Sequence, residues 1–271
     1  MDHALSDVTV LDLGQVIAMP FCTMLLADLG ARVIKVESPE RGRERVSLGV
    51  KRRRDGIEER VPAAQYRDRN KLGVTLDLKT PTGLELFREL VRHADVVTEN
   101  FSVGTMERLG LGYEELRRVN PGLVYASITA FGQTGPYAPQ RGYDMLAQAI
   151  SGYMSITGYP DGPPTRSGQS ISDYYAGMLC AFSIVSALHY RQRTGKGQRI
   201  DLALLDSLLV ALETSGSATR WAARSSPAPA MSRSPARPPG SMRRPTATWP
   251  SPPPRATRCG PDSAPSSAGT I

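Results

Sequence analysis

Residues 8–37 read VTVLDLGQVIAMPFCTMLLADLGARVIKVE, and this stretch decides the fold class. The apolar run Val8–Gly14 ends in glycine, which predicts a buried strand. A proline opens the apolar stretch Pro20–Leu29 and Gly30 follows it, so a helix is expected there. Arg32–Glu37 is predicted to be a second strand. Two strands joined by a helix form a right-handed βαβ unit, so these two strands should run parallel.

The same alternation continues along the chain. Strands are expected at Val74–Leu78, Asp95–Thr98 and Leu123–Thr129, and helices at Pro81–His93, Tyr113–Val119, Tyr143–Ile150 and Asp173–Arg191. This order predicts an α/β fold with a Rossmann-like, mostly parallel sheet and flanking helices. Ligands of such sheets bind beyond the carboxyl ends of the strands. The segments to search for a site are therefore residues 14–18, 37 onward, 99–104 and 130–135.

Composition narrows the class of protein. The 271 residues are 40% hydrophobic, which suffices for a core and suggests one or two domains. We see no apolar run near the ~20 residues that a membrane span needs, and no secretory signal at the N-terminus. Cys22, Cys180 and Cys259 lie far apart in no metal-ligand spacing. A cytoplasmic protein without a metal site, a disulfide framework or a membrane partner is expected.

The chain divides after residue 213 into two regions of different composition. Residues 214–271 hold eight Arg, no Lys, one Asp and twelve of the 22 prolines. The whole net charge of +7 therefore lies in this Pro/Ser/Ala/Arg-rich tail, which we expect to be disordered. GC-rich codons read in the wrong frame give the same residues, so a frameshift is our hypothesis for the tail. Its scattered arginines do not favour nucleic-acid binding.

Two segments near the first strands raise the question of phosphate binding. Residues 38–69 form a long charged connection whose basic run Lys51–Arg54 could meet a phosphate or simply be solvated. The turn after the first strand reads GQVIAM over residues 14–19 and lacks the glycine pattern of dinucleotide-binding proteins. Since those glycines let a pyrophosphate approach the backbone, a nicotinamide enzyme is not favoured.

Asp173 is the strongest candidate for chemistry. It begins the last predicted helix, where the helix dipole favours a carboxylate. Taken alone, it could be an ordinary capping acid. Small residues surround it and leave room for a bulky acyl group: Gly168, Ser170, Ser172, Ala176 and Gly177. A carboxylate can act as a nucleophile on an activated acyl carbon.

Eight ordered motifs in residues 5–213 carry a family resemblance. They are DLGQV (12–16), ADLGARVIKVE (27–37), NKLGVTLDL (70–78), ADVVTENF (94–101), GTMERLG (104–110), GQTGP (132–136), DGPP (161–164) and TGKGQ (194–198). With these motifs the chain resembles the class III CoA-transferases, the CaiB/BaiF or formyl-CoA transferase family. The resemblance implies a transfer of CoA from an acyl-CoA donor to a carboxylic acid acceptor.

The resemblance also implies the residues that act. Asp173 matches the catalytic aspartate, which forms an aspartyl acyl-anhydride and then an aspartyl-CoA thioester. The CoA thioester is a substrate, and no permanently bound cofactor is implied. Positions that match CoA contacts are Gln15, Val16, Leu72, Asn100, Thr105, Arg108, Leu109 and Arg141. Arg41 and Arg43 match a phosphate-contact region only loosely.

The family resemblance leaves alternative functions open, and the end of this chain departs from the family pattern. Acyl-CoA racemases share the fold, but their histidine falls at Tyr143 here, so a racemase is less favoured. Family members are longer and form interlocked homodimers, and nothing after Glu213 resembles their second domain and C-terminal return segment. We therefore expect the 271-residue product to be poorly soluble and without appreciable transferase activity. The alternative is a non-catalytic CoA-binding fragment or a pseudogene product.

Overall fold

The computed structural model describes residues 3–39, 50–54, 57–61, 66–159 and 161–212, without side chains for 50–54 and 57–61. Several predictions from the sequence fall outside these ranges. They are the disorder and frame of the tail and the roles of Arg41 and Arg43, all of which stay predictions. The side chains of Lys51–Arg54 are likewise not described.

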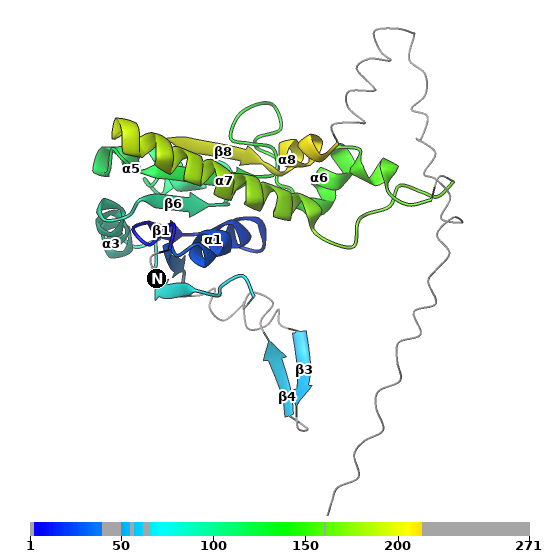
Figure 1. The fold of residues 1–271 in the computed structure, drawn as a ribbon, viewed down its shortest axis with the longest axis horizontal. Coiled ribbons are helices and arrows are strands. Elements are labelled where there is room, and N and C mark those ends of the chain that lie inside the picture. Colours follow the sequence, from blue (N-terminus) through cyan, green and yellow to red (C-terminus); the bar gives the residue numbers. More distant parts are fainter. Residues whose placement is uncertain (1–2, 40–49, 55–56, 62–65, 160, 213–271) are drawn as a thin grey trace, which may run out of the picture. The chain divides into compact units, whose positions relative to one another are not determined.

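A six-stranded parallel sheet forms the centre of the fold (Figure 1). Its strands are β1 (Thr9–Asp12), β2 (Arg32–Glu37), β5 (Lys71–Thr75), β6 (Val96–Glu99), β7 (Val124–Thr129) and β8 (Arg199–Ala203). They lie in the order β5-β2-β1-β6-β7-β8, and every pairing is parallel. The predicted α/β fold with a Rossmann-like sheet is confirmed. The order reverses between β1 and β6, which makes their carboxyl ends the expected place for a ligand.

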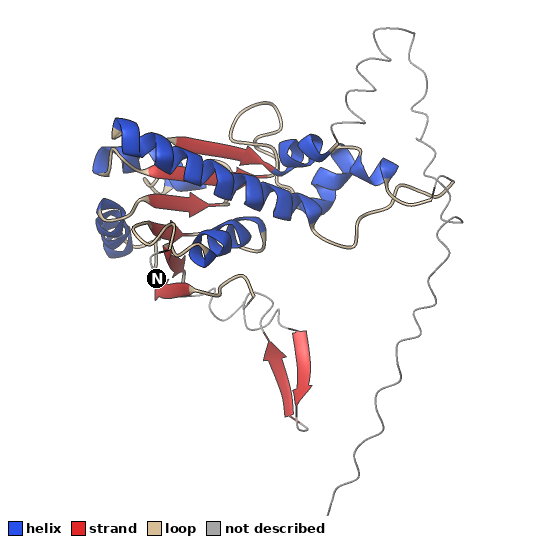
Figure 2. Cartoon of the chain, viewed as in Figure 1, coloured by secondary structure: helices blue, strands red, loops and turns tan. Residues whose placement is uncertain are grey.

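Helices cover both faces of this sheet (Figure 2). One group packs into a first hydrophobic cluster: α1 (Ala18–Asp28), α6 (Asp144–Ile150), α7 (Ile171–Thr194) and α8 (Leu204–Ala211). The other group packs into a second cluster: α3 (Pro81–Arg92), α4 (Thr105–Arg108) and α5 (Tyr113–Val119). A 3-10 helix, η1 (Tyr153–Ile156), follows α6.

The two clusters exist because successive strand side chains point to opposite faces. Val10 belongs to the first cluster and Leu11 to the second, and Val96 and Val97 divide in the same way. Apolar residues on both faces are the pattern of a parallel strand that is covered on both sides. The continuous apolar runs of the sequence therefore gave the strand positions correctly for β1 and β6.

Several elements differ from the sequence prediction. β5 lies three residues earlier than expected, because Leu76 and Leu78 follow the strand and pack half-buried against the second cluster. The connection over residues 38–69, for which no regular structure was expected, holds an antiparallel hairpin of β3 (Val50–Arg54) and β4 (Ile57–Val61). The short elements α4, β8 and α8 were not predicted.

Helix α7 is the longest helix among the described residues and crosses the face of the sheet beside α1 (Figure 1). The sequence placed its buried face on Leu179, Phe182, Val185 and Leu188, which is wrong in part, because Phe182 is 73% exposed. Small side chains such as Ala176 and Cys180 face the core instead. Among the described residues, α7 alone is long and apolar enough to cross a membrane. This is weak support for a span, because the core helix of a soluble protein has the same character.

Candidate active site

Two loops meet at the point where the strand order reverses. The backbone N–H of Gln15, after β1, donates to Oδ1 of Asn100, after β6, at 2.7 Å. Nδ2 of Asn100 donates back to the carbonyl oxygen of Gln15 at 2.8 Å. The Asn100 side chain therefore fixes the backbone of the β1–α1 loop through both of its polar ends. The predicted site residues Gln15 and Asn100 are brought together by the fold.

The residue after this pair has a strained backbone. Val16 has a φ of +62°, and its side chain is 61% exposed. A β-branched residue seldom adopts this left-handed conformation, which costs on the order of 1–3 kcal/mol and persists only where the surroundings impose it. Gln15 is locked on one side, and on the other α1 begins with Phe21 N–H donating to the Ile17 carbonyl at 2.8 Å. Val16 therefore projects outward from a fixed loop.

A buried charged cluster lies beneath this loop, and the sequence reasoning missed it. Oδ2 of Asp12 accepts hydrogen bonds from Thr23 Oγ1 at 2.8 Å, Lys35 Nζ at 3.3 Å and Lys71 Nζ at 3.0 Å. Its Oδ1 accepts from the N–H of Gly14 at 2.7 Å, and Lys35 also donates to the Gly14 carbonyl. The signal was present: charged residues inside apolar strand runs are seldom buried unless they are paired.

Burial and ion pairing act in opposite directions on the pKa values of this cluster. Burial favours the neutral carboxyl, but the positive charges of Lys35 and Lys71 outweigh it and hold the pKa of Asp12 below its ordinary value. Burial also lowers the pKa of Lys71. Lys71 donates to the Pro20 carbonyl at 2.9 Å and to Thr23 Oγ1 at 2.7 Å as well. The cluster therefore ties β1, β2 and β5 to the start of α1.

Asp173 is the third residue of α7 and is partly buried. Burial, reinforced by the nearby charge of Asp144, raises its pKa to about 7, while the positive charge of Arg67 acts in the opposite direction. Among the described residues, nothing donates a hydrogen bond to its carboxylate. Asp173 is thus a carboxyl group near half-ionisation at neutral pH and without a structural partner. This distinguishes it from the ordinary capping acid that the sequence left open.

The start of α7 is instead held by Asp144, which sequence reasoning also missed. Oδ1 of this buried carboxylate accepts from the N–H of Ser172 at 3.0 Å and from its Oγ at 2.9 Å. Its Oδ2 accepts from Gln148 Nε2 at 2.7 Å and lies 3.9 Å from an Nη2 of Arg166. Because Asp144 satisfies the first turn of the helix from α6, the neighbouring Asp173 is left available.

Close packing against α1 fixes where α7 begins. The rings of Phe21 and Tyr174 meet edge to face with centroids 4.9 Å apart. One turn further on, a side chain added at Gly177 would come within 2.8 Å of the Ala18 carbonyl oxygen. Since α7 leads into β8 and returns along the parallel sheet, it starts at the carboxyl edge, where β1 and β6 end. Asp173 therefore lies at the same edge as Gln15 and Asn100.

The other predicted CoA contacts lie in two groups. Thr105 and Arg108 are on α4, which follows Asn100, and Arg108 Nη2 donates to Thr105 Oγ1 at 2.9 Å. Leu109 packs partly against the second cluster, so only part of it can meet a ligand. Leu72, on the edge strand β5, and Arg141, before α6, are exposed. The proposed contact of each residue with CoA stays a prediction.

A third buried carboxyl group lies at the end of β6. Glu99 accepts a hydrogen bond from the N–H of Phe101 at 2.7 Å and from the hydroxyl of Tyr125 at 3.4 Å. Burial raises the pKa of Glu99 to about 7. Because it precedes Asn100, its ionisation occurs close to the loop contact described above.

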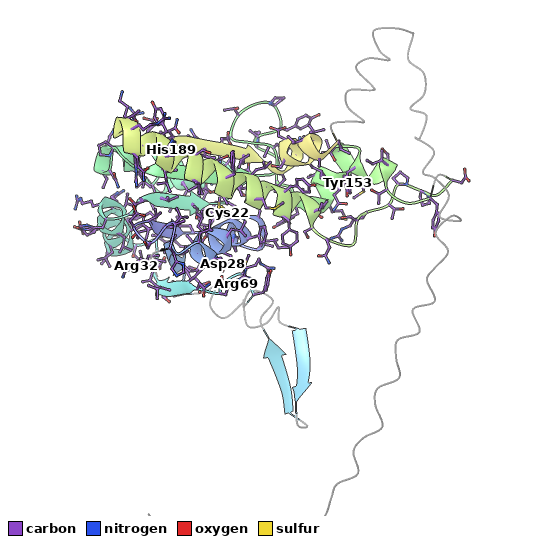
Figure 3. The ribbon with its side chains drawn as sticks, viewed as in Figure 1. Cys22, Asp28, Arg32, Arg69, Tyr153 and His189 are labelled. Atoms are coloured by element: carbon purple, nitrogen blue, oxygen red, sulfur yellow. The ribbon has the colours of Figure 1, made fainter. Side chains whose placement is uncertain are left out.

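The segment that leads into β5 is clamped onto α1. Figure 3 shows Arg69 beside Asp28. Nε of Arg69 donates to Asp28 Oδ1 at 3.0 Å, and Asn70 Nδ2 donates to the same oxygen at 3.0 Å. The guanidinium of Arg69 also stacks 4.8 Å from the ring centroid of Tyr66. These contacts fix the backbone on both sides of Arg67.

The fold and the site define an α/β protein of the doubly wound class. At the carboxyl edge of its sheet lies a carboxylate, Asp173, that accepts no hydrogen bond from the part of the chain that the structure describes. Comparison with known proteins gives the particular family. The sequence profile of CoA-transferase family III matches residues 5–243, so the chain belongs to that family. This confirms the resemblance drawn from the eight motifs.

Individual relatives agree with this assignment. A succinate–glutarate CoA-transferase of Agrobacterium fabrum is 48% identical over 204 residues, which are 74% of this chain and 51% of the relative. A succinyl-CoA–D-citramalate CoA-transferase of Chloroflexus aurantiacus is 46% identical over 78% of this chain and 51% of its own length. The chain thus spans about half the length of these relatives. The crystal structure of a CaiB/BaiF family protein from Brucella suis matches with a TM-score of 0.76 and 40% identity, covering 82% of this chain and 59% of that one.

Proposed function

We propose that this chain carries the CoA-binding site and the nucleophile of an acyl-CoA:carboxylate CoA-transferase. The observation that supports this most strongly is Asp173, a partly buried carboxylate with a pKa of about 7, to which no group among the described residues donates a hydrogen bond. A structural acid would be paired, as Asp144 is. A nucleophile must instead be placed precisely and left open to attack, and that is the condition of Asp173.

The proposed reaction proceeds through two covalent intermediates on Asp173. Its carboxylate oxygen attacks the thioester carbonyl of the donor, the carbon–sulfur bond breaks, and an aspartyl anhydride and CoA thiolate result. The thiolate attacks the aspartyl carbonyl and releases the donor acid, which leaves an aspartyl-CoA thioester. The acceptor carboxylate then attacks that thioester carbonyl, and the released thiolate takes the acceptor's acyl group from the second anhydride. Every step exchanges one activated acyl bond for another.

The loops after β1 and β6 are the proposed CoA site. Their backbone is held by the contacts between Gln15 and Asn100, and Arg108 adds a positive charge on the following helix. A prearranged loop loses little entropy when a ligand binds. The outward side chain of Val16 offers an apolar contact at the same place.

The donor and acceptor are proposed to be dicarboxylic. The two relatives described above are named for succinate, glutarate and citramalate, each of which carries two carboxyl groups.

The first half of the reaction needs only the donor thioester, Asp173 and the CoA site. We therefore expect residues 1–271 to perform that half. We propose that residues 1–271 alone complete the full transfer poorly, which the exposure of Phe182 on α7 and Val210 on α8 supports. The interlocked homodimer and the cytoplasmic location stay predictions.

The racemase alternative gains no support from the site. His3, His93 and His189 are all exposed, and Tyr143 is an exposed residue at the start of α6. Proton transfer at an acyl carbon needs a base beside the substrate, and a histidine within reach of Asp173 would be required for the pair. The other alternative is a fragment that binds CoA but catalyses no reaction. The following test distinguishes it from the proposed function.

A single-turnover experiment tests the proposed function. The purified chain is mixed with succinyl-CoA and an excess of thiol reagent, which captures the CoA thiolate set free by anhydride formation before it can return to the aspartyl carbonyl; CoA binding is measured separately by calorimetry. We expect Asp173→Asn to bind CoA like the unaltered chain and to release no thiol above background. Binding of CoA without thiol release in the unaltered chain would identify a non-catalytic fragment. Equal thiol release by both proteins would contradict the role of Asp173.

A further inference from the structure

Glu99 is a buried acid that the proposed reaction does not use. It ends β6, at the carboxyl edge where the strand order reverses, and only 3% of it is exposed. Among the described residues, no cation pairs with its carboxylate within 4.0 Å, whereas the buried Asp12 pairs with two lysines. Acids are seldom fully buried without such a pair, so the placement of Glu99 calls for an explanation.

The hydrogen bonds of Glu99 enclose Asn100. Oε2 of Glu99 accepts from the N–H of Phe101 at 2.7 Å, two residues further along the chain. The backbone is therefore tied on both sides of Asn100, by the strand pairing of β6 before it and by Glu99 after it. Asn100 in turn holds the N–H and the carbonyl oxygen of Gln15, at 2.7 and 2.8 Å. These contacts connect Glu99 through Asn100 to the β1–α1 loop.

The groups around Glu99 leave its charge finely balanced. Burial raises the pKa of Glu99 to about 7, reinforced by the charge of Glu107 on α4 and opposed by the two hydrogen bonds it accepts and by Arg199 on β8. The second of these bonds joins Oε1 to the hydroxyl of Tyr125 on β7, at 3.4 Å. Burial and the charge of Glu99 raise the pKa of Tyr125, so this hydroxyl remains a donor at neutral pH.

We propose that Glu99 is a positioning residue whose ionised carboxylate holds Asn100 in the orientation that fixes the β1–α1 loop for CoA. The inference rests on the proposed function and adds to it a residue that acts through Asn100. A charged acceptor makes a hydrogen bond about twice as strong as a neutral one. Protonation of Glu99 therefore loosens the amide of Phe101 and, with it, the hold of Asn100 on Gln15. A looser loop loses more entropy when CoA binds, so the affinity for CoA falls as the pH decreases below 7.

The test compares Glu99→Gln with its parent at two pH values. Both carry Asp173→Asn, which removes the other carboxyl group whose pKa is about 7. Calorimetry measures the Kd for CoA, and the ratio of the variant's Kd to the parent's is compared, because the titration of the CoA phosphates cancels in it. We expect a ratio of about three to ten at pH 8, where Glu99 is ionised, and within about twofold at pH 6, where it is mostly neutral. Glu114→Gln, the same change at an exposed acid of α5, is the matched control and should bind like the parent at both pH values.

A second measurement needs no CoA. In amide correlation NMR spectra of the free parent, the N–H signal of Gln15 should shift with a midpoint near pH 7, and in Glu99→Gln this shift should be absent. If Glu99→Gln is unfolded, Tyr125→Phe takes its place. Removing a hydrogen bond that favours the carboxylate should move the midpoint of the Gln15 signal to a higher pH.

The outcomes separate positioning from general support of the fold. A ratio that is high at pH 8 and disappears at pH 6, together with a Gln15 signal that follows Glu99, supports the inference. Equal ratios at the two pH values, as a purely structural role would give, or a Gln15 midpoint that neither substitution changes, overturns it. If the chain binds no CoA but the Gln15 signal still follows Glu99, the positioning of the loop is upheld while the proposed function is contradicted.

Discussion

Asp173 combines two conflicting requirements in one residue. To attack a thioester it must be ionised, yet burial and the charge of Asp144 raise its pKa to about 7 and favour the neutral acid. The native protein therefore binds this proton more tightly than the unfolded chain, in which an aspartate has a pKa near 3.9. It follows that the contribution of Asp173 to stability falls as the pH rises from about 4 to about 7.

Replacing Asp173 by asparagine should remove the free-energy cost of holding a partly buried, ionised carboxylate. We expect Asp173→Asn to raise the Tm at pH 8 by about 2 °C or more, because an uncharged amide replaces a partly buried ion. At pH 4.5 the native carboxyl is already neutral, so the difference should shrink. Thermal unfolding at the two pH values measures this. A variant that is less stable than the unaltered chain at pH 8 would show that Asp173 stabilises the fold and is not held at a cost.

The hydrogen bonds of Asn100 predict an effect on the affinity for CoA. Asn100→Ala removes both hydrogen bonds to Gln15 and frees the strained loop at Val16. Losing them should cost about 1–3 kcal/mol of CoA binding, or roughly tenfold or more in Kd. Calorimetric titration with CoA measures the loss.

Asn120→Ala provides the matched control for this prediction. Asn120 also joins two segments, through Val91 and Ala94, but it does so at the amino edge of the sheet. It should lower stability without changing the affinity for CoA. Equal losses of affinity in both variants would mean that the effect of Asn100 is general destabilisation.

At the scale of elements, the packing of α7 against α1 determines where Asp173, the proposed nucleophile, lies. Gly177 faces the backbone of Ala18 so closely that an added methyl group would lie 2.8 Å from its carbonyl oxygen. Gly177→Ala should therefore separate the two helices and destabilise the fold by about 1–3 kcal/mol. Because Asp173 is one turn away on the same helix, thiol release should fall too.

A second glycine variant, before the start of α7, is the control for an added methyl group that meets no neighbour. Gly168 has nothing within 4 Å of the position where a side chain would be added. Gly168→Ala should therefore leave the Tm almost unchanged. Urea unfolding of both variants checks the pair, and equal stability of Gly177→Ala and the unaltered chain would contradict the close contact.

The elements also show what the sequence could and could not predict. β2 and α5 were predicted with their observed bounds, because apolar runs and helix periods are local signals. β5 was displaced, since an edge strand exposes Leu72 while the apolar Leu76 and Leu78 pack beyond its end. Asp173 was proposed as the nucleophile from its local setting and the family resemblance, and that role stays a prediction. Asp144, which holds Ser172 at the start of α7, was missed because only folding brings it there.

For the molecule as a whole, the cluster of Asp12 joins three strands and a helix. Asp12→Asn leaves Lys35 and Lys71 buried together without a counter-charge, and we expect a loss of about 3–5 kcal/mol in unfolding free energy at pH 7. The lowered pKa of Asp12 means that its contribution is present above its ordinary pKa and is lost as the pH falls through the lower, folded value.

Asp28→Asn is the control for the buried cluster. It breaks the partly exposed ion pair with Arg69 and should cost at most about 1 kcal/mol. Denaturant unfolding of the two variants measures both losses. If the two substitutions were equally mild, the cluster of Asp12 would not hold the strands together.

The central claim is that Asp173 becomes covalently acylated, and trapping that intermediate tests it most directly. The chain is incubated with succinyl-CoA and hydroxylamine, digested, and examined by mass spectrometry for a hydroxamate on the peptide that contains Asp173. Labelling should be confined to Asp173, absent in Asp173→Asn, and stronger at pH 8 than at pH 6, because only the ionised carboxylate attacks. Cleavage of succinyl-CoA with no label on Asp173, or labelling of another carboxyl group in its place, would contradict the account.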